Sequence, residues 1–393
     1  MIIDNLQRYA VRILDMYSGD IPLQGWLKNF FRENPQMGSR DRRQVTEMVY
    51  CYYRLGHSLK NISKRERIIS GLFLTNNKKE PLLEFLQPDW CELVDRPMEE
   101  KLEIVRMKFP DFDLLEIFPW KNLLSEGIDH RVYCLSFLEK PRLFIRVRPG
   151  KEKTILDNLV KHQIEFRDAD PLVTLPFRAY SFANTTKLDG VFRLNFEAVI
   201  QDLSSQRTAL FLKKEGNKIS EAWDCCSGSG GKSILLTDMN PGFKLTVSDI
   251  RESILNNLKK RFIEAGMSSP AFFKADLTDQ NDLPKQMFSF ILADLPCTGS
   301  GTWSRTPEAM YFFNPQSISN YRQRQEKILS NINTRLKPGG TLVYITCSVF
   351  AEENEGIISF IKTRSKLIPG QSELILGYHE AADSMYVSRM EKC

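Results

Sequence analysis

The stretch "EAWDCCSGSGGKS" (residues 221–233) decides the fold, because a turn of small residues here joins a strand-like stretch to a helix. A glycine run that ends in Gly-Lys-Ser is typical of a phosphate-binding loop. That loop also requires a glycine five residues before its Gly-Lys pair, and the residue five before Gly231 is Cys226. The stretch therefore fails the phosphate-loop pattern by one residue, and its ligand must be inferred from the chain that follows.

Strand-like and helical stretches alternate after this turn. The strand-like stretches end at, or just before, Asp224, Asp249, Asp276, Asp294 and Cys347. Helical stretches such as "RESILNNLKKRFIEAGM" and "SISNYRQRQEKILSNINTRL" lie between them, and "KPGG" closes the second. This alternation is typical of βαβ units, so we expect a Rossmann-like α/β fold with a mainly parallel, doubly wound sheet.

Two further parts are predicted before this sheet. Residues 1–135 are expected to form an all-helical domain, because apolar residues recur with helical spacing from Leu6 to Tyr17 and from Val45 to Leu55. Ser39 or Asp41 is placed to cap the second of these helices.

Residues 136–198 are expected to form a small α+β module, which leaves 199–393 for the α/β domain. Within the module, "RLFIRVR" (142–148) alternates like a strand and "TILDNLVKHQI" is helical. The stretches "AYSFAN" and "VFRLNF" also resemble short strands.

Composition restricts the class of protein. The 393-residue chain has a formal net charge of +5, which permits a polyanionic partner without requiring one. Its eight cysteines form no Cys-x-x-Cys pair and it has four histidines, so we expect neither a metal site nor a disulfide framework. The N-terminus lacks the apolar run of a signal peptide, and no stretch approaches the roughly 18 apolar residues of a membrane span. We therefore expect a cytoplasmic protein without a membrane partner.

The polar strand ends indicate a cofactor that contains a nucleoside. In a doubly wound sheet, ligands bind beyond the carboxyl ends of the strands, and an acid like Asp249 commonly hydrogen-bonds a ribose there. A dinucleotide would require G-x-G-x-x-G, but Ser233 and Ile234 stand where that spacing needs glycine. S-adenosylmethionine fits better, with its amino-acid end against the turn and its adenosine against Asp249 and Asp276.

Two cysteines indicate the chemistry. Cys297 and Cys347 are predicted at strand ends on one rim, whereas four others are expected to be small buried apolar residues, namely Cys51, Cys91, Cys134 and Cys225. Carbon 5 of a pyrimidine accepts a methyl group only when it is electron-rich, and a thiolate that adds at carbon 6 makes it so. One thiol could add and the second could assist release. Asp294 could hold the cytosine edge by accepting the amino hydrogen or lending a proton to the ring nitrogen.

Several motifs resemble those of the RsmB/Nop-type RNA (cytosine-5) methyltransferases. "QDLSSQ" (201–206) resembles the family's entry segment, and "CSGSGGK" (226–232) stands where the family has Cys-Ala-Ala-Pro-Gly-Gly-Lys. "DLPCTGSGTWSRTPE" (294–308) is similar to its Asp-Ala-Pro-Cys-Ser-Gly-x-Gly segment, and "LKPGGTLVYITCSVFAEENE" (336–355) to its Thr-Cys-Ser and Glu-Glu-Asn-Glu signature. "GSRDRRQVTEMVYCYYRLG" resembles a NusB-like domain, and residues 140–198 resemble a small RNA-recognition-type module.

The resemblance implies an RNA (cytosine-5) methyltransferase that uses S-adenosylmethionine and no metal. It implies that Cys347 is the nucleophile, that Cys297 assists product release, and that Asp294 and Lys232 face the base. The residues that it implies for cofactor binding are Cys226, Ser227, Gly228, Ser229, Gly230, Gly231, Lys232, Asp249, Asp276 and Asp294.

The sequence departs from the family pattern at two places. Ser-Gly-Ser at 227–229 replaces Ala-Ala-Pro, which is expected to loosen the turn because the rigid proline is missing. Ser304 stands where the family usually has the first of two arginines, which leaves Arg305 alone and is expected to weaken one RNA contact.

RNA is the expected partner, either ribosomal or transfer RNA, bound by a monomer. Basic residues expected to contact its phosphates are Arg40, Arg42, Arg43, Arg146 and Arg148, although the first three could equally form a solvated helix face. Two other functions stay open. A DNA cytosine-5 methyltransferase would use the Pro-Cys thiol of Cys297 and would not need Cys347, and a non-catalytic RNA-binding module would need neither thiol.

Overall fold

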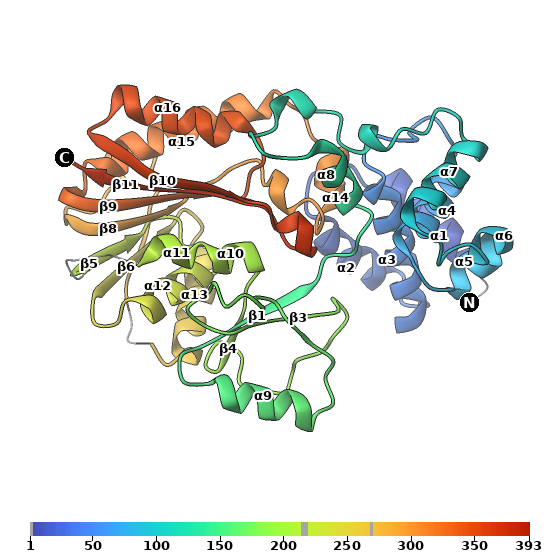
Figure 1. The fold of residues 1–393 in the computed structure, drawn as a ribbon, viewed down its shortest axis with the longest axis horizontal. Helices are drawn as coiled ribbons and strands as arrows, with labels where there is room; N and C mark the ends of the chain where they lie inside the picture. Colours follow the sequence, from blue (N-terminus) through green and yellow to red (C-terminus); the bar gives the residue numbers. More distant parts are fainter. Residues whose placement is uncertain (1–2, 214–218, 268–269) are drawn as a thin grey trace. The chain divides into compact units, whose positions relative to one another are not determined.

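The computed structural model of this chain describes residues 3–213, 219–267 and 270–393 (Figure 1). The described chain divides into two compact units. The first contains Met1–Asn122, Ile128–Lys140 and Trp303–Asn314, and the second contains Leu123–Gly127, Pro141–Thr302 and Pro315–Cys393. Each unit is described by itself below.

The first unit is helical, which confirms the prediction for the N-terminal region. Its elements are α1 (Ile3–Met16), α2 (Leu23–Glu33), α3 (Ser39–Arg54), α4 (Lys64–Thr75), α5 (Pro81–Leu86), α6 (Pro88–Cys91), α7 (Met98–Lys108), α8 (His130–Ser136), α14 (Pro307–Tyr311) and the 3-10 turn η1 (Leu114–Ile117). A second 3-10 turn, η2 (Lys121–Leu123), lies where this unit passes into the other.

Amphipathic spacing explains these helices. The stripe of α1 predicted from the sequence is buried, with Leu6, Ala10 and Ile13 at most 1% exposed. The predicted cap of α3 was wrong: the helix begins at Ser39 itself, and its N-cap is Gly38, which has no side chain to accept a hydrogen bond. A capping box, formed by Ser63 with Glu66, instead opens α4.

The segment Trp303–Asn314 belongs to the helical unit although it follows the cysteine-containing loop near Cys297 in sequence. Its aromatic rings pack among those of the N-terminal helices. The ring of Tyr311 lies 5.2 Å from that of Tyr53, and the ring of Phe312 lies 5.6 Å from that of Tyr17. Such offset aromatic contacts add to the stabilisation from burial alone. The helical unit is thus assembled from N-terminal segments and from one segment that interrupts the α/β region in sequence.

The second unit starts with a small antiparallel sheet of order β2-β3-β1-β4, with one helix in its sequence. Its elements are β1 (Leu143–Val147), α9 (Glu152–Lys161), β2 (Arg167–Asp168), β3 (Ala179–Phe182) and β4 (Ala198–Ile200). The strand predicted at "VFRLNF" (191–196) was wrong, because these residues form turns and the fourth strand begins at Ala198. Its side chains Val191 and Phe192 instead fill the module's core.

A seven-stranded sheet of order β10-β11-β9-β8-β5-β6-β7 forms the rest of this unit. Its strands are β5 (Glu221–Asp224), β6 (Lys244–Asp249), β7 (Ala271–Lys274), β8 (Phe288–Asp294), β9 (Leu336–Thr346), β10 (Leu367–Ile375) and β11 (Met385–Lys392). The five strands β5 to β9 pair in parallel, and β10 and β11 add an antiparallel edge.

Helices cover both faces of this sheet, which confirms the Rossmann-like prediction (Figure 1). The helices are α10 (Leu203–Arg207), α11 (Ala209–Leu212), α12 (Gly231–Met239), α13 (Glu252–Glu264), α15 (Ser317–Asn333) and α16 (Glu355–Arg364), with 3-10 turns η3 (Gln280–Asp282), η4 (Ser300–Thr302), η5 (Ala351–Glu353) and η6 (Gly377–Glu380). Apolar side chains of α12 and α13 fill one core, and those of α15 and α16 fill the other. The predicted closing turn "KPGG" (337–340) was wrong, since these residues lie inside β9.

Arg146 and Arg148 hold the small module and α12 together, so the prediction that they contact RNA was wrong. Arg146 lies in β1, and Arg148 follows the last residue of that strand. Each forms an ion pair with Asp238 of α12, with N···O distances of 2.6 Å for Arg146 and 2.8 Å for Arg148. The side chains of Arg146 and Asp238 are 0% and 6% exposed. Arg146 is buried, Arg148 is 14% exposed, and both are paired with Asp238, so they are not part of a surface that binds phosphates.

This cluster predicts a large loss of stability when its one carboxylate is removed. We expect Asp238→Ala to lower the free energy of unfolding by about 3–5 kcal/mol, since the buried Arg146 and the partly buried Arg148 lose their counter-charge. The control is Asp168→Ala, which removes an exposed ion pair with Arg178 and should cost less than about 1 kcal/mol. Urea denaturation measures both, and an equal, small loss in the two variants would contradict this account of the cluster.

Candidate functional site

The turn between β5 and α12 is held by backbone and side-chain hydrogen bonds. The backbone N–H and the hydroxyl of Ser227 both donate to the carbonyl oxygen of Ser248, at 2.9 and 3.0 Å. Gly228 and Gly230 have φ angles of +49° and +80°, in the region that favours glycine. A Cβ on Gly230 would also lie 2.0 Å from a methyl carbon of Leu258. These bonds hold the turn in the absence of the proline whose loss was expected to loosen it.

Asp249 connects this turn to the end of β6. Its carboxylate accepts the N–H of Gly228 at 3.1 Å, and it also accepts hydrogen bonds from the backbone and guanidinium of Arg251. Burial alone would raise the pKa of Asp249, but the hydrogen bonds from Arg251 and Gly228 lower it below its ordinary value. The residue is therefore an ionised acceptor next to the glycine turn.

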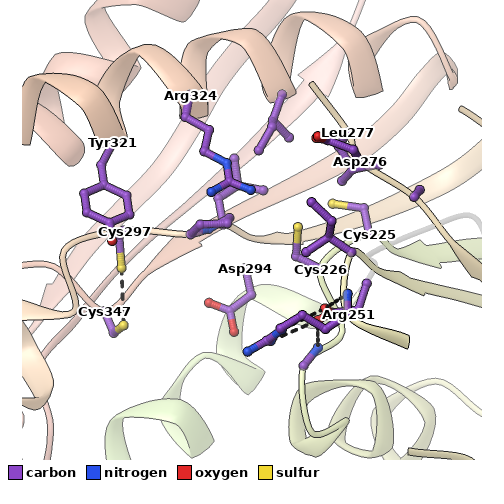
Figure 2. Close-up of a pocket in the computed structure, with 17 residues that line it drawn as sticks. Cys225, Cys226, Arg251, Asp276, Leu277, Asp294, Cys297, Tyr321, Arg324 and Cys347 are labelled. Atoms are coloured by element: carbon purple, nitrogen blue, oxygen red, sulfur yellow. Dashed lines mark hydrogen bonds and ion pairs between the residues drawn. The ribbon is translucent and has the colours of Figure 1, made fainter. Parts of the chain in front are cut away.

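A cavity of about 490 Å³ lies beyond the carboxyl ends of the parallel strands (Figure 2). Predicted site residues in its lining are Cys226, Gly228, Asp249, Asp276, Asp294, Cys297 and Cys347. Asp276 follows β7, and its carboxylate accepts the N–H and hydroxyl of Thr278 at 3.0 and 2.8 Å. The cavity has the size of a typical small-molecule site. Five strands thus bring residues that are far apart in sequence to one place.

All of the remaining predicted residues except Gly230 lie around a neighbouring cavity of about 330 Å³. Its lining includes Ser227, Ser229, Gly231 and Lys232, and it shares Cys226, Gly228, Asp294 and Cys347 with the first cavity. Gly230 lines neither cavity and packs against Leu258 instead. Gly230 therefore shapes the turn and is not itself placed to contact a ligand.

The two cysteines named from the sequence lie side by side (Figure 2). Their Sγ atoms are 3.3 Å apart, at the end of loops that follow the neighbouring parallel strands β8 and β9. The hydrogen bond with Cys347 is the largest cause that raises the pKa of the Cys297 thiol well above its ordinary value, and burial adds to it. Cys297 therefore keeps its proton under conditions in which an ordinary thiol begins to lose it. The other cysteines expected in the core, Cys51, Cys91, Cys134 and Cys225, are buried.

Lys232 and Asp294 form an ion pair beside the cysteines. The Nζ atom of Lys232 lies 2.8 Å from Oδ2 of Asp294, and the two side chains are 12% and 31% exposed. Burial alone would lower the pKa of Lys232, but the Asp294 carboxylate raises it above its ordinary value. Asp294 lies between the cysteine pair and Cys226 in Figure 2, with its carboxylate accessible from both cavities.

Asp224 was recognised in the sequence as a strand end but not as a site residue. It lines the second cavity, and burial raises its pKa to about 7. Ser233 donates a hydrogen bond to Oδ2, whereas Oδ1 is buried without a hydrogen-bond partner among the described residues. An unpartnered carboxylate oxygen of this kind favours a ligand that carries N–H groups.

Tyr321 and Arg324 were missed altogether. Both come from α15 and line the first cavity above Cys297 (Figure 2). The strand-end pattern could not identify them because they lie on a helix, and no local signal distinguishes them from its solvated residues. Among the residues that the structure describes, no group of three or more His, Cys, Asp or Glu side chains is arranged to hold a metal ion. No helix in those same ranges is long and apolar enough for a membrane span.

Part of the chain, including most of this site, is similar to a described protein family. Residues 209–380 match the family model described as 16S rRNA methyltransferase RsmB/F. Over these residues, which make up less than half of the chain, the protein resembles the RsmB/F methyltransferases. The expectation of a methyltransferase domain of the S-adenosylmethionine-dependent type is thereby confirmed.

Two relatives illustrate how far the likeness extends. The chain is 33% identical over 174 residues to a probable ribosomal RNA small subunit methyltransferase B of Coxiella burnetii, with 43% of this chain and 40% of that protein covered. It is 30% identical over 203 residues to ribosomal RNA small subunit methyltransferase B of Salmonella paratyphi A, with 49% of this chain and 46% of that protein covered. The matched regions therefore span less than half of the length of these relatives.

Solved structures confirm the fold over a longer range. The crystal structure of PH0851 has a TM-score of 0.70 and 18% identity, and the match covers 98% of this chain and 97% of that chain. The structure of NSun6 from Pyrococcus horikoshii with SFG has a TM-score of 0.60 and 15% identity, and the match covers 71% of this chain and 97% of that chain. At these identities the likeness concerns the fold.

The raised pKa of Asp224 predicts how stability depends on pH. The folded carboxyl has a pKa of about 7 and an unfolded one about 3.9, so the folded protein binds the proton more tightly and loses stability as pH rises between these values. Asp224→Asn removes this loss. Both proteins are compared at pH 5 and at pH 8. The decrease in the free energy of unfolding between these two pH values should be about 2 kcal/mol smaller in the variant than in the wild type.

Urea denaturation at four pH values measures this difference. The control is Asp276→Asn, because hydrogen bonds to Thr278 lower the pKa of Asp276, and its carboxyl is ionised in both states over this range. An identical pH dependence in Asp224→Asn and the wild type would show that Asp224 is already ionised at pH 5.

Proposed function

We propose that this chain methylates carbon 5 of a cytosine in RNA with S-adenosylmethionine as the methyl donor. The observation that carries the proposal is the pair of thiols, Cys297 and Cys347, with Sγ atoms 3.3 Å apart on the wall of a 490 Å³ cavity. Proteins that only bind RNA have no use for two adjacent thiols at such a position. A cytosine-5 methyltransferase has a use for each of them.

Cys347 is the proposed nucleophile. Its Sγ atom would form a bond to carbon 6 of the cytosine, and the electron pair of the 5,6 double bond then makes carbon 5 nucleophilic. S-adenosylmethionine supplies the methyl group. Loss of the proton from carbon 5 restores the double bond and breaks the bond between sulfur and carbon 6. The raised pKa of Cys297 supports this assignment, because a thiol that keeps its proton is a poor nucleophile.

Cys297 would then assist release, and Asp294 would hold the base. A cytosine presents an amino N–H that the Asp294 carboxylate is able to accept. The Nζ atom of Lys232 lies 2.8 Å from that carboxylate, which raises the pKa of Lys232 and so keeps a positive charge beside the base. The two loops and the ion pair together would fix the base edge and the attacked carbon with respect to the thiols.

The cofactor would lie across the glycine turn. Asp249 is proposed to bind the ribose and Asp276 the adenosine, since both line the larger cavity. The turn from Cys226 to Lys232 would face the amino-acid end. The fit of the cofactor to this site rests on Asp224. Its buried Oδ1 atom lacks a hydrogen-bond partner among the described residues and suits the ammonium group of the cofactor's amino-acid end.

RNA is the proposed substrate, and ribosomal RNA is favoured over transfer RNA. The relatives from Coxiella burnetii and Salmonella paratyphi A are both named as small-subunit ribosomal RNA methyltransferases. Arg40 and Arg43 of α3 are exposed and are proposed to contact phosphates, whereas Arg42 donates to the carbonyl of Met37. We place the activity in the cytoplasm, in a monomer that uses no metal.

The two thiols give the sharpest test of this function. Cys347→Ala should form no covalent complex with RNA, because nothing adds to carbon 6. Cys297→Ala should still add and methylate but fail to release, so RNA stays attached to the protein. A denaturing gel, run after incubation with S-adenosylmethionine and small-subunit ribosomal RNA, should show a slow-migrating band for Cys297→Ala alone.

Cys393→Ala is the matched control, since this exposed cysteine lies outside both cavities and its loss should leave the gel pattern unchanged. A covalent band in Cys347→Ala that disappears in Cys297→Ala would exchange the two roles, as in the DNA-type mechanism. The absence of a band in every variant and of methylation in the wild type would contradict the proposed function itself.

A further inference from the structure

A buried glutamate connects the two cysteine loops. Glu353 ends the 3-10 turn η5 and has an exposure of 0%. One carboxylate oxygen accepts the N–H of Thr298 at 3.0 Å and the amide of Gln325 at 3.1 Å. The other accepts the hydroxyl groups of Thr298 and Ser348, at 2.6 and 2.5 Å. Thr298 and Ser348 are the residues directly after Cys297 and Cys347, so one side chain binds next to both thiols.

Only a carboxylate satisfies this set of donors well. Each of its two oxygens accepts two hydrogen bonds here, and the four donors come from three different parts of the fold. Burial raises the pKa of Glu353, and the hydrogen bonds from Ser348, Thr298 and Gln325 oppose that shift. A side chain of equal size without acceptors would leave the buried donors without partners.

Further contacts extend the same connection. Gln325 of α15 also donates to the carbonyl of Pro296, at 2.9 Å, so the chain is held on both sides of Cys297. Gly301 donates its N–H to the carbonyl of Cys347 at 2.8 Å. A Cβ on Gly301 would lie 3.0 Å from the same carbonyl oxygen of Cys347, which shows how closely the two loops approach. The two loops are therefore joined to one another rather than fixed separately.

We propose that Glu353 is a positioning residue that sets the separation of the Cys297 and Cys347 thiols, an inference that rests on the proposed function. Glu353 lines neither cavity and so touches no substrate. Its effect on the reaction passes through Thr298 and Ser348. The separation of the thiols decides whether one can add to carbon 6 while the other remains close enough to assist release.

A dithiol reagent tests this role without RNA or cofactor. Phenylarsine oxide joins two nearby thiols by forming two arsenic–sulfur bonds with loss of water, and peptide mapping by mass spectrometry separates a bridge between Cys297 and Cys347 from one between the adjacent Cys225 and Cys226. We expect Glu353→Met, which fills the volume without acceptors, to slow formation of the first bridge by about tenfold, the scale of one lost hydrogen bond.

Conservative and matched variants separate positioning from packing. In Glu353→Gln the amide oxygen still accepts hydrogen bonds from Thr298 and Gln325. The hydroxyl groups of Thr298 and Ser348 are able to accept hydrogen bonds from the new amide N–H groups, so the rate of bridging should stay within about threefold of the wild type. Glu308→Met is the control, because Glu308 is another buried glutamate with a pKa raised by burial, and it lies in the helical unit. In the Glu308→Met variant, the bridge between Cys297 and Cys347 should form at the wild-type rate.

If Glu353→Met does not fold, Thr298→Val replaces it, because this change removes one donor at constant size and should slow bridging by about threefold. Wild-type bridging rates in a folded Glu353→Met or Thr298→Val variant would overturn the positioning role. In methyl transfer, Glu353→Met should lower kcat while leaving KM for S-adenosylmethionine and RNA unchanged. A wild-type protein that is bridged normally but methylates no RNA would refute the proposed function and leave the positioning role standing.

Discussion

The parallel pairing of β8 with β9 is the constraint on which the rest of the site depends. It places Asp294 opposite Ile345, so the loops that follow these strands begin at the same edge of the sheet. Cys297 lies three residues past the end of β8 and Cys347 one residue past the end of β9, and their sulfur atoms meet at 3.3 Å. A slip of the register by one residue would turn every side chain of the shifted strand to the opposite face and separate the thiols. The chemistry of the site is therefore a consequence of sheet geometry.

The sequence predicted the features that repeat locally. Alternation of strands and helices gave the α/β class, and acids at strand ends identified the cavity lining because all parallel strands end at one edge. Long-range partners left no such signal. Arg146 resembled a surface cation, and its partner Asp238 lies 92 positions further along the chain. The last two strands were missed because Pro369 and Gly370 interrupt β10, where the pairing with β11 shifts register.

Two of the structure's carboxylates illustrate what residue type alone cannot reveal. Glu353 belongs to the Glu-Glu-Asn-Glu signature, but only the folded chain shows that it accepts hydrogen bonds from the residues after both cysteines. Asp224 ends a strand like Asp249, yet burial raises the pKa of Asp224 while Arg251 lowers that of Asp249. Identical side chains at equivalent strand ends thus acquire opposite electrostatic properties from their neighbours.

The central claim, methylation of carbon 5 of cytosine in RNA, is tested most directly by bisulfite sequencing of total RNA. Samples would come from cells of the source organism with the gene, without it, and complemented by either the wild-type chain or Cys347→Ala. Because 5-methylcytosine resists conversion, this account predicts one or a few protected cytosines that become convertible without the gene and regain protection only with the wild-type chain. An identical conversion pattern in all four samples would contradict it.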